Sequence, residues 1–499
     1  MQYQSTRNKS LSVSAAQAIK AGLSQEGGLF VPESLPTVSI SEIEAMSQMT
    51  YNERAYAILS KFLTDYTKEE LMDCINSAYT KEKFETASIA PVYKLNGSQY
   101  FLELWHGPTC AFKDMALQIL PHLLTKAMKK TNEDDEVVIL VATSGDTGKA
   151  ALEGFRDVLG TRIIVFYPNN GVSEIQKLQM VTQDGENVEV AAVNGNFDDA
   201  QNGVKKIFTD EGYKTVLANN HFKLSSANSI NWGRLVPQIV YYFSAYADML
   251  NANEINAGDK INVVVPTGNF GNILAAYYAK QMGLPIAKLI CASNKNNVLT
   301  DFIKTGVYNK KREFHTTISP SMDILISSNL ERFLYDISGR DDQLVASLMK
   351  SLNEDGVYEV SDELKTKISD IFYAGFCDDE HTQQTIKKCK EEFGYVIDTH
   401  TAVAKAVHDE YIEATSDLTK TVIASTASPF KFNQSVLIAL GGYGAVAGRD
   451  EFALLDELSE ESGMNIPKSL AELKDKKRKF DIVCEKEQMP QIVSEFLNI

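Results

Sequence analysis

The sequence has 499 residues, of which 44% are hydrophobic and 23% are charged, and its formal net charge is −17. This composition is typical of soluble globular proteins, and the length exceeds what one hydrophobic core usually holds, so we expect two or three domains. The acidic balance repels phosphates overall, which argues against nucleic acid and anionic membranes as partners.

Residues 1–90 are predicted to form a mostly helical covering unit, with helices over residues 14–21, 40–49 and 51–62. The first residues lack the apolar core of a signal peptide, and no apolar stretch reaches membrane-spanning length. The cysteines are scattered and show no metal-type spacing, which indicates free thiols, no metal site and a reducing compartment. We therefore expect a cytoplasmic protein.

A lysine near the start of a predicted helix is the first candidate for chemistry. Residues 100–104 are predicted to form a strand, followed by a turn and a helix that Thr109 caps. Lys113 then lies in the first helical turn, where the positive end of the helix dipole lowers the pKa of an amine. Such an amine suits Schiff-base chemistry. The alternative is a solvated lysine whose charge is offset by Asp114.

From about residue 90 onward, strand and helix patterns alternate. Buried strands are predicted at residues 137–142, 163–167, 188–193, 261–265, 289–292 and 422–424, and helices at 149–159, 198–209, 230–250 and 273–282. This alternation predicts a doubly wound α/β body with ligand loops at the carboxyl ends of the strands. Residues 300–400 are interpreted as a more helical elaboration, and the tail after residue 450 as helical and charged.

The strand at residues 137–142 opens into a turn rich in hydroxyl groups. Thr143, Ser144 and Thr147, together with the amides at the helix start, suit a carboxylate or a small phosphate. Asp146 adds negative charge and so disfavours a purely anion-binding role. The alternative interpretation is an N-capping turn without a ligand.

A second turn, at residues 266–272, is rich in Gly and Asn. Glycines let the backbone approach an anion closely, and the helix start offers free N–H groups to a phosphate. The turn matches neither the Walker loop nor the dinucleotide fingerprint, so an unliganded turn stays an alternative. A polar segment precedes the helix predicted at residues 230–250, and Arg234 in that helix either presents its guanidinium to an anion or lies on the surface.

Taken together, these segments resemble the threonine synthase family, in its long form, within the fold-type-II group of pyridoxal-phosphate enzymes. The most specific segment is residues 106–114 (HGPTCAFKD), supported by residues 143–148 (TSGDTG), 229–234 (SINWGR), 268–271 (GNFG), 319–323 (SPSMD) and 398–401 (DTHT). The resemblance implies an α/β fold in which two doubly wound domains surround a central cleft beside an N-terminal, mostly helical domain.

The resemblance also implies a division of the chain. We expect an N-terminal covering domain at residues 1–90 and a small α/β domain at residues 126–235. The large cofactor-binding domain is expected to combine residues 91–125 with 236–470, including a helical insertion at about 300–395. Residues 471–499 are expected to form a C-terminal helical tail.

Site roles follow from the same resemblance. Lys113 is implied to hold pyridoxal 5'-phosphate covalently and to move protons during catalysis. The cofactor phosphate is expected at Gly268, Asn269, Phe270, Gly271 and Asn272, and its pyridine nitrogen at Thr426. We assign the α-carboxylate of the substrate to Thr143, Ser144, Asp146 and Thr147, and its phosphate to Ser229, Asn231 and Arg234.

The implied reaction converts O-phospho-L-homoserine and water to L-threonine and phosphate, in a monomer or a homodimer. One rival is another fold-type-II lyase, such as an O-phosphohomoserine phospho-lyase or a serine/threonine dehydratase. The other is a catalytically silent relative that only binds the cofactor. The long N-terminal unit and Arg234 favour a phosphorylated substrate, and the presence of Lys113, Asn269 and Thr426 favours an active enzyme.

Overall fold

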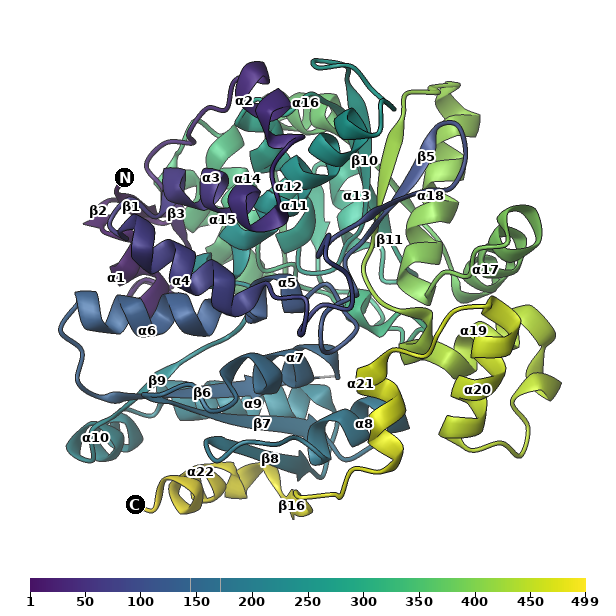
Figure 1. The fold of residues 1–499 in the computed structure, drawn as a ribbon. Coiled ribbons are helices and arrows are strands. Elements are labelled where there is room, and N and C mark those ends of the chain that lie inside the picture. The colour runs from purple at the N-terminus through teal and green to yellow at the C-terminus, as the bar shows by residue number, and fades with distance from the viewer. Residues whose placement is uncertain (144, 171) are drawn as a thin grey trace.

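A computed structural model of the chain describes residues 1–143, 145–170 and 172–499. Within this part, a six-stranded sheet has the order β14-β11-β10-β15-β5-β4 and a five-stranded sheet the order β16-β8-β7-β6-β9. In Figure 1 the five-stranded sheet lies below the six-stranded one, with helices α5 and α7 between them. The expected mixed α/β fold with a helical N-terminal region is confirmed.

The N-terminal unit is mostly helical, as predicted. Its helices are α1 (Ala15–Ala21), α2 (Ile40–Met46), α3 (Tyr51–Phe62) and α4 (Lys68–Ala78). Each helix begins with a Ser or Thr capping box, which satisfies the free amides of its first turn. The unit also contains a small antiparallel sheet of β1 (Tyr3–Ser5), β2 (Asn8–Val13) and β3 (Phe30–Pro32).

The six-stranded sheet is parallel apart from its antiparallel β4–β5 edge. Its strands are β4 (Val92–Lys94), β5 (Gln99–Glu103), β10 (Ile261–Pro266), β11 (Ile286–Ser293), β14 (Phe372–Phe376) and β15 (Thr421–Ser425). The long helix α11 (Trp232–Asn251) is buried along most of its length, and α12 (Gly271–Gln281) follows β10. Strand β5 is buried on both faces, because helices cover both sides of a parallel sheet.

The predicted insertion at residues 300–395 contributes to this sheet. It holds α13 (Val298–Thr305), β12 (Val307–Asn309), α14 (Leu330–Ile337), α15 (Asp342–Glu354), β13 (Val357–Glu359), α16 (Asp362–Ile371) and α17 (Asp379–Phe393). Strand β14 lies among these elements and pairs in parallel with β11 at the sheet edge. The segment is therefore not purely helical. Helices α18 (Thr399–Thr415), α19 (Asn433–Gly441) and α20 (Glu451–Ser462) follow it.

The five-stranded sheet is parallel. Its strands are β6 (Glu136–Ala142), β7 (Thr161–Pro168), β8 (Val188–Val193), β9 (Phe222–Ser225) and β16 (Ile482–Cys484). Its helices are α7 (Asp146–Phe155), α8 (Glu174–Val181), α9 (Phe197–Thr209) and α10 (Glu211–Asn219).

The segment predicted as a helical tail includes a strand. Strand β16 pairs with β8, so the segment completes the five-stranded sheet instead of standing apart. After α21 (Lys468–Ala471) the chain returns to this sheet and ends with α22 (Met489–Leu497). The expectation of a helical tail does not include β16, which forms because the short apolar run Ile482–Cys484 pairs with β8, otherwise the edge strand of this sheet.

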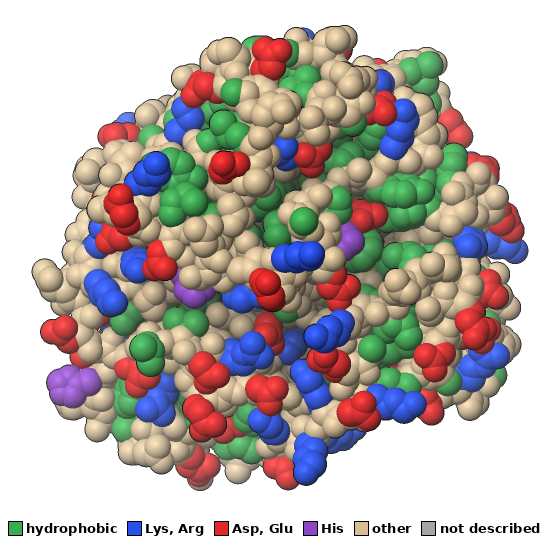
Figure 2. All heavy atoms as spheres, in the orientation of Figure 1, with side chains coloured by type: hydrophobic (Ala, Val, Ile, Leu, Met, Phe, Trp, Pro, Cys, Tyr) green, Lys and Arg blue, Asp and Glu red, His purple; other side chains and the backbone are tan. Residues whose placement is uncertain are grey.

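The surface shows no single dominant charge on the face seen in Figure 2, where Lys and Arg side chains alternate with Asp and Glu. No helix in the described part of the chain is long and apolar enough to cross a membrane.

Candidate active site

Lys113 lies between the two sheets, immediately before the short helix α5 (Asp114–Leu117). The continuous helix predicted from Thr109 is wrong, because α5 ends at Leu117 and α6 (Leu120–Lys130) starts after it. Pro121 accounts for the break, since its ring lacks an N–H group and clashes with the carbonyl four residues earlier. Thr109 does not cap a helix. Its N–H and Oγ1 donate to Asp114 Oδ2 and Oδ1 at 2.8 Å and 2.7 Å.

The Lys113 amine is nearly enclosed, with a side chain that is 11% exposed. Nζ donates to Ser321 Oγ at 3.0 Å and lies 3.6 Å from Asp146 Oδ2. Burial lowers the pKa of Lys113, and Asp146 opposes this shift. The predicted direction of the pKa shift agrees, but burial is its main cause, not the helix dipole. A solvated lysine paired with Asp114 is excluded, because Asp114 is buried against Thr109.

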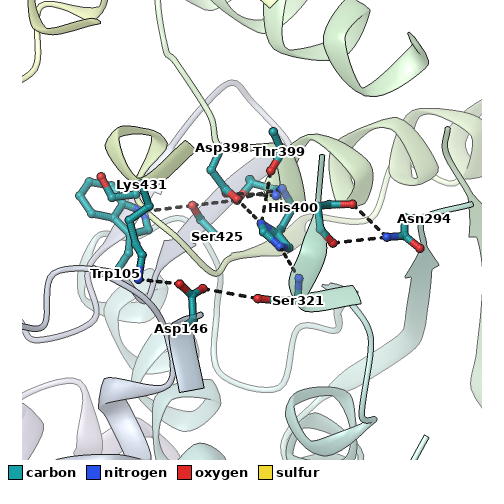
Figure 3. A network of polar contacts seen from close by, with 12 residues as sticks. Trp105, Asp146, Asn294, Ser321, Asp398, Thr399, His400, Ser425 and Lys431 are labelled. Atoms are coloured by element: carbon teal, nitrogen blue, oxygen red, sulfur yellow. Dashed lines mark hydrogen bonds and ion pairs between the residues drawn. The ribbon is translucent and has the colours of Figure 1, made fainter. Parts of the chain in front are cut away.

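Asp146 is the counter-ion of this amine, which explains an acidic residue in a turn expected to bind anions. Its Oδ1 lies 2.6 Å from Lys431 Nζ (Figure 3). The same oxygen accepts a hydrogen bond from Gln176 Nε2 at 2.9 Å. Burial alone raises the pKa of Asp146, but Lys431 and Lys113 outweigh it and hold this pKa far below its usual range. The carboxylate therefore stays ionised beside the amine.

The rest of the turn after β6 is used partly for local structure. Thr143 Oγ1 accepts from the backbone N–H groups of Gly145 and Gly148, each at 2.9 Å. Thr143 thus satisfies two backbone amides at the start of α7, although the N-cap residue itself is Gly145. Thr147 is half-buried in the first turn of α7. Ser144 lies outside the described residues.

The Gly/Asn turn reaches the same place as Lys113. A Cβ on Gly268 would lie 2.7 Å from the carbonyl oxygen of Ser321, so only glycine fits this close approach. Because Ser321 also accepts from Lys113, the turn and the amine meet at one residue. Asn269 O accepts from Asn329 Nδ2 at 3.1 Å, which fixes the turn. Phe270 is the N-cap residue of α12 and has a left-handed backbone, with a φ of 61°. Gly271 is the first residue of the helix.

Two buried donors in this region lack protein partners in the described structure. Asn272 Oδ1 accepts from Tyr241 at 2.7 Å and from Tyr242, whereas its Nδ2 has no partner. Arg234 donates through Nη1 to the Ala227 carbonyl, but its buried Nε has none. Burial lowers the pKa of Arg234 to about 10. Arg234 is therefore not a surface arginine.

The other predicted ligands, Asn231, Ser229 and Thr426, differ in whether their side chains already have hydrogen-bond partners in the protein. Asn231 caps α11, accepting from Gly233 N at 2.8 Å, and its Nδ2 donates to the Ile19 carbonyl. Both polar atoms of the Asn231 side chain thus have protein partners. Its role as a ligand of the substrate phosphate stays a prediction. Ser229 Oγ accepts from Asn329 Nδ2 at 3.3 Å. Thr426 is buried, and its carbonyl accepts from the backbone N–H of Phe112 at 2.8 Å, next to Lys113.

Sequence reasoning gave no role to Ser321, Lys431 or His400. Ser321 N donates to His400 Nε2 at 3.1 Å, and the other ring nitrogen, Nδ1, lies 2.8 Å from Asp398 Oδ2 (Figure 3). This geometry indicates a neutral ring protonated at Nδ1, which holds Ser321 beside Lys113. Ser321 and His400 lie in segments 319–323 and 398–401, which supported the family resemblance, but the resemblance assigned these two residues no role. Lys431 lies outside the segments that supported the resemblance.

Three family profiles together match most of the chain. Residues 2–79 match the family profile described as threonine synthase N terminus, residues 88–423 that of pyridoxal-phosphate dependent enzymes, and residues 401–493 that of threonine synthase, C-terminal.

Individual relatives agree with these profiles. Threonine synthase-like 1 of Pongo abelii is 43% identical over 435 residues, covering 85% of this chain and 58% of that protein. The chain thus spans little more than half the length of this relative. Threonine synthase of Pseudomonas aeruginosa is 39% identical over 438 residues, covering 87% of this chain and 90% of that protein.

A solved structure extends the likeness to three dimensions. The crystal structure of pyridoxal-phosphate-bound threonine synthase from Brucella melitensis has a TM-score of 0.87 at 35% identity, covering 100% of this chain and 98% of that one. The chain therefore belongs to the threonine synthase family of pyridoxal-phosphate dependent enzymes.

Proposed function

We propose that this chain is a threonine synthase that converts O-phospho-L-homoserine and water to L-threonine and phosphate. The observation that carries the proposal is the meeting of Lys113 and the Gly268 turn at Ser321, in a chain of this family. The names of its relatives support the reaction.

The site residues fit pyridoxal 5'-phosphate. Lys113 supplies a nearly buried amine with a lowered pKa, as covalent attachment to an aldehyde requires. The turn from Gly268 to Asn272 ends at the start of α12, where backbone amides favour a phosphate. The unpartnered Nδ2 of Asn272 offers a further buried donor. We propose Gly268, Asn269, Phe270, Gly271 and Asn272 as the phosphate site and Thr426 as the neighbour of the pyridine nitrogen.

When bound, the cofactor supplies the electron sink that lets bonds at the carbons of an amino acid break. The chain positions and moves protons. Lys113 Nζ is the base that takes the Cα proton and returns protons to later carbons of the substrate. Asp146 and Ser321 hold this amine in place through the 3.6 Å and 3.0 Å contacts described above.

The charges around Lys113 favour an anionic substrate. Lys431 and Arg234 bring two more cations into the region, against the carboxylate of Asp146. Arg234 Nε is buried and lacks a protein partner in the described structure, so we propose it as a ligand of the substrate phosphate, with Ser229 and Asn231 nearby. The α-carboxylate is assigned to the turn at residues 143–147, in which Thr143, Ser144 and Thr147 supply the donors and Asp146 acts as counter-ion of Lys113.

The proposal also includes the cellular compartment, the domain boundaries and the assembly of the protein. The six cysteines are buried and unpaired, which supports a reducing compartment such as the cytoplasm. We propose that the domains follow the sheets, with the small domain at residues 126–235 joined by the β16 segment. A monomer or a homodimer stays the expected assembly.

Product analysis tests the proposal. Incubation of the purified chain with pyridoxal phosphate and O-phospho-L-homoserine is expected to release phosphate and threonine in equal amounts. Lys113→Ala is expected to lose at least about 1,000-fold in turnover, since both the covalent anchor and the base are removed, while its circular dichroism spectrum stays unchanged. Phosphate released together with 2-oxobutyrate instead of threonine would contradict the proposal and indicate a dehydratase-type lyase.

A further inference from the structure

Lys431 is a buried cation that enters the proposed function only through the positive charge it brings to the region of Lys113. It follows β15 in the short segment Pro429–Phe432, and its side chain is 0% exposed. Lysines are almost never fully buried unless their charge is paired. Lys431 Nζ lies 2.6 Å from Asp146 Oδ1 and donates to the Thr109 carbonyl at 2.9 Å.

Both residues that Lys431 contacts, Thr109 and Asp146, are close to Lys113 through the chain or through a further contact. Thr109 is bound through its N–H and hydroxyl to Asp114, the residue next to Lys113 in the chain. Asp146 turns its second oxygen, Oδ2, toward Lys113 at 3.6 Å, and this oxygen also accepts from Ser321 Oγ at 3.4 Å. One carboxylate therefore lies between two ammonium groups that come from distant parts of the chain, and Figure 3 shows its contacts with Lys431 and Ser321.

We propose, building on the function proposed above, that Lys431 is a positioning residue that acts on Lys113 through Asp146. It binds Oδ1 of the carboxylate, so that only Oδ2 faces the reacting amine. Its positive charge also lies close enough to repel a proton on Lys113. Lys431 thereby keeps the amine ready to act as a base without touching the substrate itself.

Replacing Lys431 with a neutral residue is expected to raise the pKa of Lys113, for two reasons that act in the same direction. Removing Lys431 leaves the Asp146 charge wholly to Lys113, and it removes a repelling cation; both changes favour protonated Lys113. Burial and Lys431 together lower the pKa of Lys113 in the intact protein. The other titratable groups facing this cluster are Arg234 from α11, Asp114 from α5, His400 from α18 and Cys110 from the preceding turn.

The rate at which the Lys113 amine reacts with an aldehyde measures this effect, because only the unprotonated amine attacks. The full-length chain, freed of cofactor, is given a short pulse of pyridoxal phosphate and then borohydride. Mass spectrometry of the Lys113 peptide gives the labelling rate at each pH. We expect a wild-type midpoint below 10.5, the ordinary lysine value. In Lys431→Met the midpoint rises by one unit or more, and labelling at pH 7.5 falls at least about ten-fold.

Matched variants separate this role from simple stabilisation. Lys405→Met removes another buried lysine, 2.6 Å from Asp409, and is expected to keep the wild-type midpoint. Lys431→Arg retains the charge and is expected to keep it as well. Asp146→Asn lowers the midpoint, and adding Lys431→Met to this variant raises it less than in the wild type, because the two residues act together.

A wild-type midpoint in Lys431→Met overturns the inference, whatever happens to the melting temperature of that variant. If Lys431→Met does not fold, Asp146→Asn decides, since an unchanged midpoint there means that no carboxylate acts between the lysines. Labelling needs no substrate. A chain that labels as expected but forms no threonine therefore fails only the proposed function, and one that forms threonine with an unshifted midpoint fails only this inference.

Discussion

Single residues in this site take their meaning from partners far away in the sequence. Asp146 faces Lys113, Lys431, Ser321 and Gln176, which arrive from four separate segments. An acidic residue at this position looked unfavourable for anion binding when only its neighbours in the chain were considered. Its contacts show that it balances lysines, which leaves the binding of anions to other donors.

Arg234 gives the prediction that belongs at this scale. Arg234→Met removes the charge but keeps most of the side-chain volume, so α11 is expected to stay folded. A buried hydrogen bond to a charged group is worth about 1.5–3 kcal/mol, and the KM for O-phosphohomoserine should rise about ten-fold or more. The cofactor content, measured on the same preparations by absorbance after release in alkali, should stay unchanged. An unaltered KM would remove Arg234 from the substrate site.

At the scale of elements, the site depends on how closely three segments approach one another. The turn before α12 passes so near Ser321 that a Cβ on Gly268 would lie 2.7 Å from the Ser321 carbonyl oxygen. Ser321 is in turn fixed by His400 at the start of α18. The turn, the Ser321 segment and α18 therefore support one another, and a shift in one moves the candidate phosphate site.

This packing predicts that Gly268→Ala weakens cofactor binding by about ten-fold or more, because the turn must move away from Ser321. Gly97→Ala is the matched control, since a Cβ there meets no atom within 4 Å. Titration of the cofactor-free proteins with pyridoxal phosphate provides the dissociation constants. Equal constants for the two variants would show that the close approach does not shape the site.

At the scale of the whole molecule, an ion pair between the partly exposed Arg7 and the buried Glu331 joins the N-terminal unit to helix α14. Arg7 Nη2 and Nε bind Glu331 on α14 at 2.7 Å and 2.8 Å, and Thr6 adds a hydrogen bond to the same carboxylate. Glu331 is 5% exposed, so it depends on these partners. The unit that covers the body of the protein is thus fixed to it by a specific ion pair as well as by apolar packing.

Breaking this pair is expected to destabilise the molecule. Arg7→Met leaves the Glu331 charge buried and should lower the free energy of unfolding by about 3 kcal/mol. Lys9→Met is the control: Lys9 is 63% exposed and lies 3.9 Å from Asp342, so its loss should change stability by less than about 0.5 kcal/mol. Urea unfolding can be followed by tryptophan fluorescence, to which both Trp105 and Trp232 contribute; Trp232 packs against Tyr3 of this unit. Equal stability of the two variants would argue against the ion pair as an anchor.

The sequence predicted what depends on local pattern. Helix α3 and strand β8 have the predicted bounds, because their periodicity and flanking residues are contained in the segments themselves. It could not predict contacts that depend on the fold, such as those of Lys431 with Asp146 and Thr109, since their segments lie hundreds of residues apart. The short helix α5 was missed because Pro121 acts on the carbonyl four residues before it, a local signal that the apolar spacing obscured.

The most direct test of the account is the fate of water oxygen in the reaction. If the chain is a threonine synthase, the carbon–oxygen bond to phosphate breaks and water adds to the neighbouring carbon. In ¹⁸O-labelled water the threonine should then carry one ¹⁸O in its hydroxyl group, and the phosphate should carry none. Phosphate containing ¹⁸O, together with homoserine instead of threonine, would show simple hydrolysis at phosphorus and contradict the function proposed for this chain.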